Sequence, residues 1–270
     1  MILSDAERRL SGARRAAAAA AEYLVRAFWD DHVVTAKGTY DLHLSADTKA
    51  GQAIGKFLGR EFPGEFLLEE DGPPDPGTSE WVWIVDPLDG TVNYKHHLPW
   101  YCVSVACYHR TEASDHPLWR HGRPVASVVL APHLNQEFWA LAAEGAWEGG
   151  RRLAVSTGGL GSGILSVSRG SKAADQRWVR DFLGQVGPEA QKTRNQGAAA
   201  LDLAYVAQGS LGAHVQRSIQ SWDIAAGAHL VLEAGGRFFS EPDPEGGQHV
   251  VAGGPGAFAR IQEVYGCVLS

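Results

Sequence analysis

The segment at residues 81–91, W-V-W-I-V-D-P-L-D-G-T, restricts the fold more than any other part of this chain. Its first five residues are aromatic or β-branched, a composition that is typical of a short buried strand. Asp86 follows where that strand is expected to end, because Pro87 has no N–H group with which to continue a ladder of hydrogen bonds. We therefore expect a fold in which a core strand delivers carboxylates to the end of its sheet.

The residues after the strand carry oxygen ligands in a short space. Asp86 and Asp89 are three residues apart, and Thr91 adds a hydroxyl two residues later. A turn at this point would direct both carboxylates and the carbonyl of Leu88 into one small volume. Hard oxygen ligands of this kind suit Mg²⁺. The same D-P-x-D-G pattern also describes an ordinary turn, so the spacing alone leaves both interpretations open.

Two further segments accompany this motif. Residues 66–71, F-L-L-E-E-D, read as an apolar strand that runs into an acidic cluster, and residues 221–227, S-W-D-I-A-A-G, place Asp223 at the start of an apolar helix. The three segments resemble the signatures of the inositol monophosphatase family, which are Mg²⁺-dependent, lithium-sensitive phosphatases. The family patterns are G-E-E-S, D-P-[IL]-D-G-[ST] and W-D-x-A-[AS]-G. Here E-E-D stands for the first pattern, D-P-L-D-G-T for the second and W-D-I-A-A-G for the third, in the family's order and at similar separations.

The resemblance implies an α/β (α+β) fold, a layered α-β-α-β-α sandwich of the inositol monophosphatase and fructose-1,6-bisphosphatase type. The residues themselves predict helices over 4–29 and 45–60, followed by a mostly antiparallel run of strands. From residue 164 onward, predicted strands and helices alternate, which favours buried strands in an α/β layout. We expect two halves: 1–155, an α+β half with the metal-binding motif, and 156–270, an α/β half that completes the site.

The resemblance also implies a metal site that holds two or three Mg²⁺ ions. Cations are needed because an acidic pocket would otherwise repel a phosphate group. Strand parity allows either Glu69 or Glu70 to face the site, and the family pattern favours Glu69. The implied ligands are Glu69, Asp86 and the Leu88 carbonyl for the first ion, and Asp86, Asp89 and Asp223 for the second.

The catalytic roles implied by the resemblance lie close to these ligands. Glu69 and Thr91 would position the attacking water, and Asp47 would accept a hydrogen bond from the Thr91 hydroxyl. The backbone N–H groups of Gly90 and Thr91 would receive phosphate oxygens. Asp47 stands at the start of a predicted helix, where a cap is an alternative role. The same alternative holds for Asp223.

The substrate side departs from the family pattern. Gly197 and Ala199 belong to a segment that resembles the family's G-x-A motif, which contacts the substrate's ring. Gln216 lies seven residues before Asp223, where inositol-specific members carry a glutamate. An amide keeps a hydrogen bond to a hydroxyl but loses its charge-assisted strength. The implied substrate contacts are Asp89, Gly90, Thr91, Gly197, Ala199, Gln216 and Asp223.

The resulting hypothesis is Mg²⁺-dependent hydrolysis of a small phosphate monoester, foremost inositol-1-phosphate to inositol and phosphate, by a metal-activated water. Alternatives with the same chemistry are fructose-1,6-bisphosphate, 3′-phosphoadenosine 5′-phosphate, histidinol phosphate and NADP. Basic residues facing a second phosphate would distinguish some of these, and the candidates are Arg169, Lys172 and Arg194. A hypothesis from another class is an inactive metal-binding scaffold.

The amino-acid composition limits the binding partners and the compartment that we expect for this protein. A net charge of −7 disfavours a nucleic-acid backbone, which requires a basic face. No stretch approaches the ~18 apolar residues of a membrane span. The three cysteines lack C-x-x-C spacing, which favours a reducing cytoplasm. Analogy with the family, together with nine tryptophans, leads us to expect a cytoplasmic homodimer.

Overall fold

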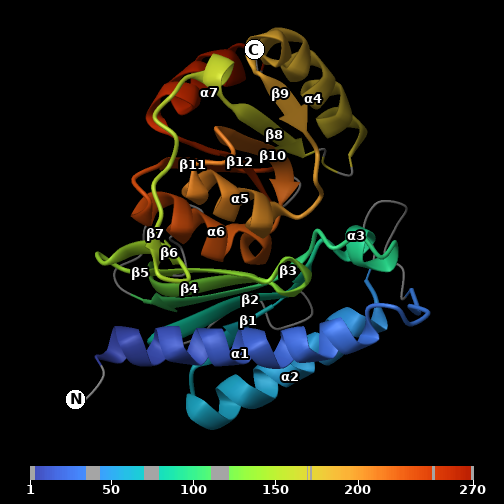
Figure 1. The fold of residues 1–270 in the computed structure, drawn as a ribbon, viewed down its shortest axis with the longest axis vertical. Helices are drawn as coiled ribbons and strands as arrows, with labels where there is room; N and C mark the ends of the chain where they lie inside the picture. Colours follow the sequence, from blue (N-terminus) through green and yellow to red (C-terminus); the bar gives the residue numbers. More distant parts are fainter. Residues whose placement is uncertain are drawn as a thin grey trace.

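The computed structural model describes residues 4–34, 43–69, 79–110, 122–168, 170, 172–244 and 247–268. These residues form five layers, in which two helices, a sheet, two more helices, a second sheet and a last pair of helices follow one another (Figure 1). The two sheets hold seven and five strands. The layered α-β-α-β-α sandwich predicted from the sequence is confirmed.

The first sheet is built from the strands that the sequence places after residue 66. Its strands lie side by side in chain order, and only β1 and β2 run parallel, so the predicted antiparallel meander is confirmed. The strands are β1 (Phe66–Leu68), β2 (Trp81–Asp89), β3 (Cys102–His109), β4 (Arg123–Ala131), β5 (Gln136–Leu141), β6 (Gly145–Glu148) and β7 (Arg151–Arg152).

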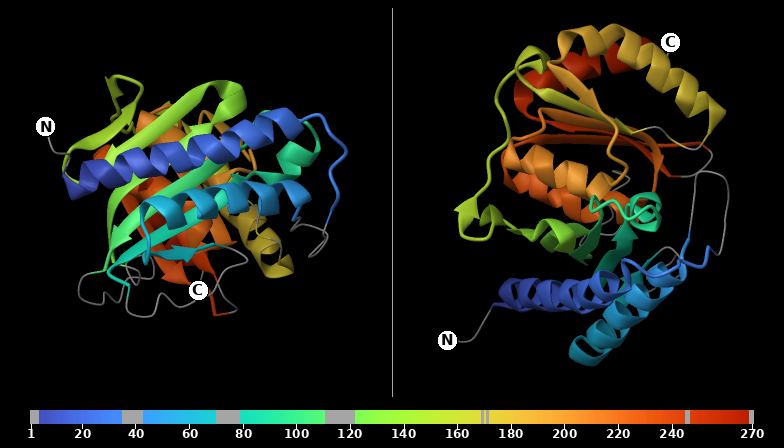
Figure 2. Two further views of the ribbon diagram at one scale, coloured as in Figure 1. Left: turned by 90° about the horizontal axis from the view of Figure 1, so that it is seen from below. Right: turned by 45° about the vertical axis from the view of Figure 1, so that its right-hand side comes forward.

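The outer face of this sheet is covered by α1 (Asp5–Ala27) and α2 (Ser45–Glu61), as Figure 2 shows from below. A capping box starts α1: Ser4 accepts from the Glu7 amide, and Glu7 accepts from the Ser4 amide. The buried face of α1 is largely alanine, including Ala13, Ala17 and Ala20 with no exposed surface. Such short side chains let the helix axis lie close to β3 and β4.

The middle layer consists of α5 (Ala199–Gln208) and α6 (Ser221–Glu233), which pack on both sheets. Gly227 of α6 faces Leu203 of α5, and a Cβ at Gly227 would lie 2.5 Å from the Cβ of Leu203. The two helices therefore pack closely through a residue without a side chain. This layer packs on both sheets and so joins the two predicted halves. The division of the chain between residues 155 and 156 stays a prediction.

The second sheet contains the parallel pairs β8–β10 and β8–β9 beside antiparallel β12 and β11. Its strands are β8 (Ile164–Ser168), β9 (Lys192–Arg194), β10 (Ala213–Ile219), β11 (Arg237–Pro242) and β12 (Gln248–Gly253). The outer layer is α4 (Ala173–Val186) and α7 (Pro255–Val268), and the short helices are α3 (Thr91–Lys95), η2 (Pro132–Leu134), η3 (Leu160–Ser162) and η4 (Gly187–Glu189). None of the helices described here is long and apolar enough to span a bilayer.

One expectation about β2 is wrong. The strand does not end at Asp86 but continues through Pro87 to Asp89. Asp86 pairs with Ser104 and Asp89 with Cys102, so three steps on β2 match two steps on β3 and form a bulge. The proline lies inside this irregularity, where its missing N–H interrupts no regular ladder.

The bulge also changes which way the side chains face. Ile84 packs in the core beside α5 and α6, whereas Val85 and Leu88 both pack in the core beneath α1 and α2. Residues three apart on a regular strand face opposite sides. The extra residue instead puts Asp86 and Asp89 in the same phase of the strand, with Asp89 against the start of α5 and Asp86 at a pocket beside α2.

Candidate active site

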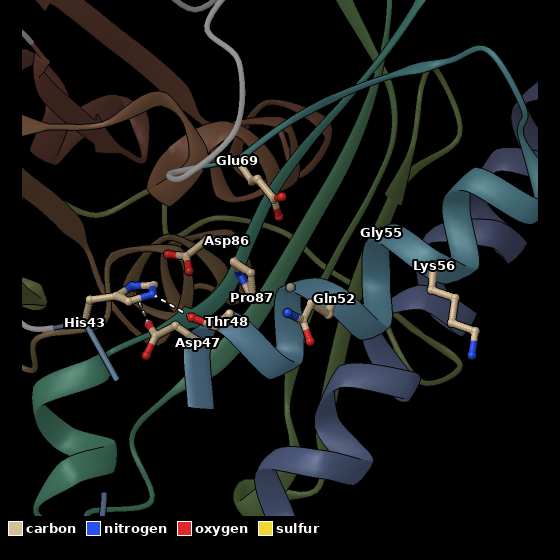
Figure 3. A pocket seen from close by; sticks show the side chains of 10 residues that line it. His43, Asp47, Thr48, Gln52, Gly55, Lys56, Glu69, Asp86 and Pro87 are labelled. Carbon is tan, nitrogen blue, oxygen red and sulfur yellow. Dashed lines mark hydrogen bonds and ion pairs between the residues drawn. The ribbon is translucent and has the colours of Figure 1, made fainter. Parts of the chain in front are cut away.

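Carboxylates from several elements meet beside the bulge of β2. A pocket of about 420 Å³ lies between α2 and the ends of β1 and β2. Three of the residues that line it are acidic: Asp47 on α2, Glu69 after β1, and Asp86 on β2. Figure 3 shows these three side chains around the pocket, with His43 and Thr48 beside Asp47. The structure thus brings together carboxylates from segments far apart in the sequence.

Asp86 lies at the centre of the negative charge. Its Oδ1 accepts a hydrogen bond of 2.9 Å from the Leu88 amide, which holds the carboxylate against its own turn. Burial raises the pKa of Asp86 well above its usual range, and the charges of Asp223 and Asp89 raise it further. Ionisation of Asp86 is therefore unfavourable unless a positive charge is brought close to it.

Asp47 makes both contacts that its two expected roles require. Its Oδ2 accepts from the Leu44 amide at 2.9 Å, which caps the start of α2, and its Oδ1 accepts from the Thr91 hydroxyl at 3.1 Å. Thr91 also lies 3.0 Å from the carbonyl of Leu88, the second acceptor for its hydroxyl. Burial raises the pKa of Asp47 to about 6. The hydroxyl of Thr91 is therefore held between a carboxylate and a carbonyl that were both expected in the site.

Asp89 is bound to α5, a contact that the sequence did not reveal. Its carboxylate accepts from the amides of Ala199 at 3.1 Å and Ala200 at 2.7 Å, and the Cys102 thiol lies 3.5 Å away. Burial raises the pKa of Asp89 to about 6, although the two amides act in the opposite direction. Asp89 thus joins the first sheet to the Gly197–Ala199 segment, which the sequence predicted to lie at the same site.

The chain leaves β2 through a tight turn at Gly90. Its φ is +91°, and a Cβ there would lie 2.9 Å from the carbonyl oxygen of Trp100, so glycine is required. The following helix α3 is a single short turn that begins at Thr91. The Gly90 and Thr91 amides thus lie directly beside the carboxylates, where the resemblance places phosphate oxygens.

Asn93 on α3 is a residue that the sequence analysis missed. Its Nδ2 lies 2.7 Å from the carbonyl oxygens of both Trp100 and Gln196. It therefore ties the turn after β2 to the loop that leads into α5. No local pattern marks this residue, because Gln196 is 103 positions away in the sequence and Trp100 lies beyond an irregular turn.

Asp223 and Gln216 lie on the side of the second sheet. Asp223 accepts from the Gln220 amide at 3.1 Å, the capping contact that was its alternative role, while its charge also acts on Asp86. Gln216 is the β10 residue that precedes a bulge, and it is half-buried. It does not line the pocket of Figure 3.

The basic residues proposed for a second phosphate make other contacts. Lys172 forms an ion pair of 2.7 Å with Asp243, and the Arg194 guanidinium donates to the carbonyl of Thr193. Arg169 and the alternative ligand Glu70 lie outside the described residues. The described part of the chain therefore offers no support for a second phosphate beside Lys172 or Arg194.

The acidic residues fit a divalent cation by their chemistry. In the described ranges, no three His, Cys, Asp or Glu side chains lie close enough together to hold a metal ion in the present rotamers. However, the half-buried Asp86 has like charges near it that raise its pKa, and carboxylates are the donors that Mg²⁺ prefers. A cation would offset this repulsion, so the donor set suits the ion that the sequence implied.

Comparisons with known proteins cover nearly the whole chain. The model of the inositol monophosphatase family matches residues 5–255. The inositol-1-monophosphatase of Mesorhizobium japonicum is 36% identical over 228 residues, 82% of this chain and 79% of that protein. The Nus factor SuhB of Pseudomonas aeruginosa is 36% identical over 238 residues, 84% and 83% of the two chains. The crystal structure of the extragenic suppressor protein SuhB of Bartonella henselae superposes with a TM-score of 0.83 at 30% identity, covering 94% and 97%.

Proposed function

Because this chain belongs to the inositol monophosphatase family and is a phosphoric monoester hydrolase, we propose that its substrate is inositol-1-phosphate and its cofactor Mg²⁺. The observation that carries the proposal is the group of buried and half-buried carboxylates around Asp86, which repel one another and any phosphate unless cations are present. The relative from Mesorhizobium japonicum, named for inositol-1-phosphate hydrolysis, supports the choice of substrate.

We assign the cations to the carboxylates that the sequence predicted. When bound, Mg²⁺ would offset the negative charge of the phosphate and polarise its oxygens. The proposed ligands are Glu69, Asp86, the Leu88 carbonyl, Asp89 and Asp223. Asp89 would then serve two groups, because its carboxylate already accepts hydrogen bonds from the start of α5.

The side chains around Thr91 would orient the attacking water. The Thr91 hydroxyl donates to one of its two acceptors, Asp47 or Leu88, and its oxygen remains able to accept a hydrogen bond from the water. Glu69, which lines the pocket, would accept the proton that the water loses. The Gly90 and Thr91 amides are proposed to hold phosphate oxygens, and Gln216 to contact the alcohol part of the ester.

Thr91 provides a test of this arrangement. We expect Thr91→Val, which keeps the shape and removes the hydroxyl, to lower kcat by about 10²-fold or more, because the hydroxyl orients the water for a proton transfer to Glu69 that contributes about 10²–10⁴-fold. Thr91→Ser should retain most of the activity. Steady-state phosphate release at saturating substrate measures both. Equal losses in the two variants would show that the hydroxyl is not what matters at this position.

The substrate is tested by phosphate release with Mg²⁺ across inositol-1-phosphate, fructose-1,6-bisphosphate, 3′-phosphoadenosine 5′-phosphate, histidinol phosphate and NADP. We expect inositol-1-phosphate to lead in kcat/KM by about tenfold, and Asp89→Asn to be inactive. Asp181→Asn on α4, whose carboxylate pairs with exposed Arg180, is the matched control and should keep full activity. A higher kcat/KM for another ester would rule out inositol-1-phosphate as the preferred substrate but would keep the proposed metal-dependent hydrolysis. No turnover of any ester, with Mg²⁺ still stabilising the fold, would favour a scaffold.

We further propose that the protein works in the cytoplasm as a homodimer. Cys102 and Cys107 are buried free thiols, as a reducing compartment permits. Trp29 and Leu98 are 74% and 53% exposed, and large apolar side chains of this kind are enriched at interfaces. Sedimentation velocity of the wild type and of Trp29→Ser measures the oligomeric state. A monomeric wild type at micromolar concentration would contradict the proposal.

A further inference from the structure

A row of buried polar side chains lies between the second sheet and α5. Ser166 on β8, His214 on β10 and Asp202 on α5 have no exposed surface. The parallel register places Ser166 opposite His214 and Ser168 opposite Gln216, so the four side chains share one face of the two strands. The row leads from the interior to Gln216, at the end of the parallel pairing.

The direction of the hydrogen bonds in this row is fixed at Asp202. A carboxylate can only accept, and Asp202 accepts from Gln196 Nε2 at 2.6 Å and from Ser166 Oγ at 2.6 Å. Ser166 has a single proton, and this short contact to a carboxylate uses it. The ring nitrogen Nδ1 of His214 lies 3.1 Å from Ser166 Oγ and 3.5 Å from Asp202. Both neighbours are acceptors, so Nδ1 must carry a proton and donate.

The other ring nitrogen of His214 is therefore an acceptor. Burial lowers the pKa of His214, and the charge of Asp202 opposes this only in part, so the ring is neutral at pH 7. A neutral imidazole has one N–H group. With that proton on Nδ1, Nε2 presents a lone pair. The Nε2 atom is buried and has no hydrogen-bond partner among the described residues. It requires a donor.

Gln216 is the neighbour that can supply this donor. It lies two residues beyond His214 on the same face, and its Oε1 is likewise buried without a partner in the described part of the chain. Two acceptors would then face each other. A half-turn of the amide exchanges Oε1 and Nε2 with almost no change of shape and pairs a donor with the bare nitrogen. Ser168 does not decide the orientation, because a hydroxyl can donate or accept.

We propose that a buried relay through Asp202, Ser166 and His214 fixes the orientation of the Gln216 amide, by placing its amino group on Nε2 of His214 and turning its carbonyl oxygen away from the relay. In this orientation the carbonyl oxygen is a neutral acceptor for a hydroxyl of the alcohol that the proposed function places at Gln216. His214 is a positioning residue, since it acts only through Gln216. The inference rests on the proposed function for the place of Gln216 at the substrate, but the relay itself does not.

The relay is tested without turnover by ¹⁵N NMR of the imidazole rings of the metal-free protein. Of eleven histidines, the His214 signals are those lost in His214→Phe. We expect Nδ1 to be protonated and Nε2 bare. Ser127→Ala, which removes the partner of the other buried Ser–His pair, Ser127 and His229, should leave the His214 signals unchanged. A proton on Nε2 of His214 would overturn the relay.

The specificity is tested by kinetics on inositol-1-phosphate. Gln216→Met removes the acceptor at similar size, and we expect KM to rise about threefold to tenfold with kcat within about twofold. His214→Phe should give a similar rise, and the double variant no further rise, because both changes remove one contact. An unchanged KM in active Gln216→Met, or additive effects, would overturn the assignment of Gln216. If no ester is hydrolysed at all, the proposed function fails while the NMR result still decides the relay.

Discussion

Replacement of Asp86 by asparagine is expected to abolish activity while making the metal-free fold more stable. The side chain keeps its shape but loses a proposed bridging ligand. Metal catalysis is worth several kcal/mol of transition-state stabilisation, so kcat/KM should fall by about 10³-fold or more. Stability should rise because the neutral amide removes a buried charge next to Asp223 and Asp89. Phosphate release with Mg²⁺ and urea unfolding in EDTA measure the two effects.

The pH dependence gives this prediction a definite sign. The pKa of Asp86 is higher in the folded protein than in the unfolded chain. Below the unfolded pKa of about 4, the carboxyl group is protonated in both states and does not change the free energy of unfolding. Above the folded pKa it is ionised in both states, and its ionisation lowers the free energy of unfolding by the full amount. The stability gained in Asp86→Asn should therefore grow as the pH rises above about 4. Asp181→Asn, an exposed carboxylate on α4, should show no such trend. A variant that is less stable than the wild type in EDTA at pH 7 would contradict this account of the site.

Replacement of Gly227 by alanine is expected to destabilise the protein by about 1–3 kcal/mol, the usual cost of overpacking a core. The new Cβ would lie 2.5 Å from the Cβ of Leu203 and 2.7 Å from its Cδ1. Because these atoms belong to α5 and α6, the two helices would have to move apart between the sheets. Urea unfolding measures the change in the free energy of unfolding.

Gly59→Ala is the matched control, because Gly59 is also a helical glycine. Among the described residues, no atom lies within 4 Å of the point that a Cβ would occupy there, so the methyl group meets no obstacle. Alanine is then the better helix former, and we expect a gain of about 0.5–1 kcal/mol. If the two substitutions changed stability in the same direction, close packing of α5 on α6 would not explain why residue 227 is a glycine.

Local patterns predicted the parts of the fold that neighbouring residues determine. The helix predicted over 4–29 is present as α1, and the switch from antiparallel strands to alternating elements appears in the structure. The resemblance supplied the contact between Asp47 and Thr91, which lie 44 positions apart and which no periodicity connects. The family and fold are confirmed, whereas the roles of the site residues stay predictions.

The misses share a physical cause, which is that their partners lie far along the chain. Strand β9 consists of Lys192, Thr193 and Arg194, whose composition does not suggest a strand, and it forms because β8 offers an edge. Asp89 was predicted as a metal ligand and substrate contact but not as a partner of α5, since nothing near it in sequence shows the amides of α5. His214 and Asp202 were not noticed because a buried polar residue has meaning only beside its partner.

The bulge in β2 has a consequence for how this segment can change in evolution. Substitutions between Asp86 and Asp89 alter one side chain at a time, but an insertion or deletion alters the phase of the strand. Removing one residue would restore regular alternation and turn the second carboxylate away from α5, toward the face of the sheet that α2 covers. The length of this segment, more than the identity of its middle residues, therefore keeps the side chains of Asp86 and Asp89 in the same phase of the strand.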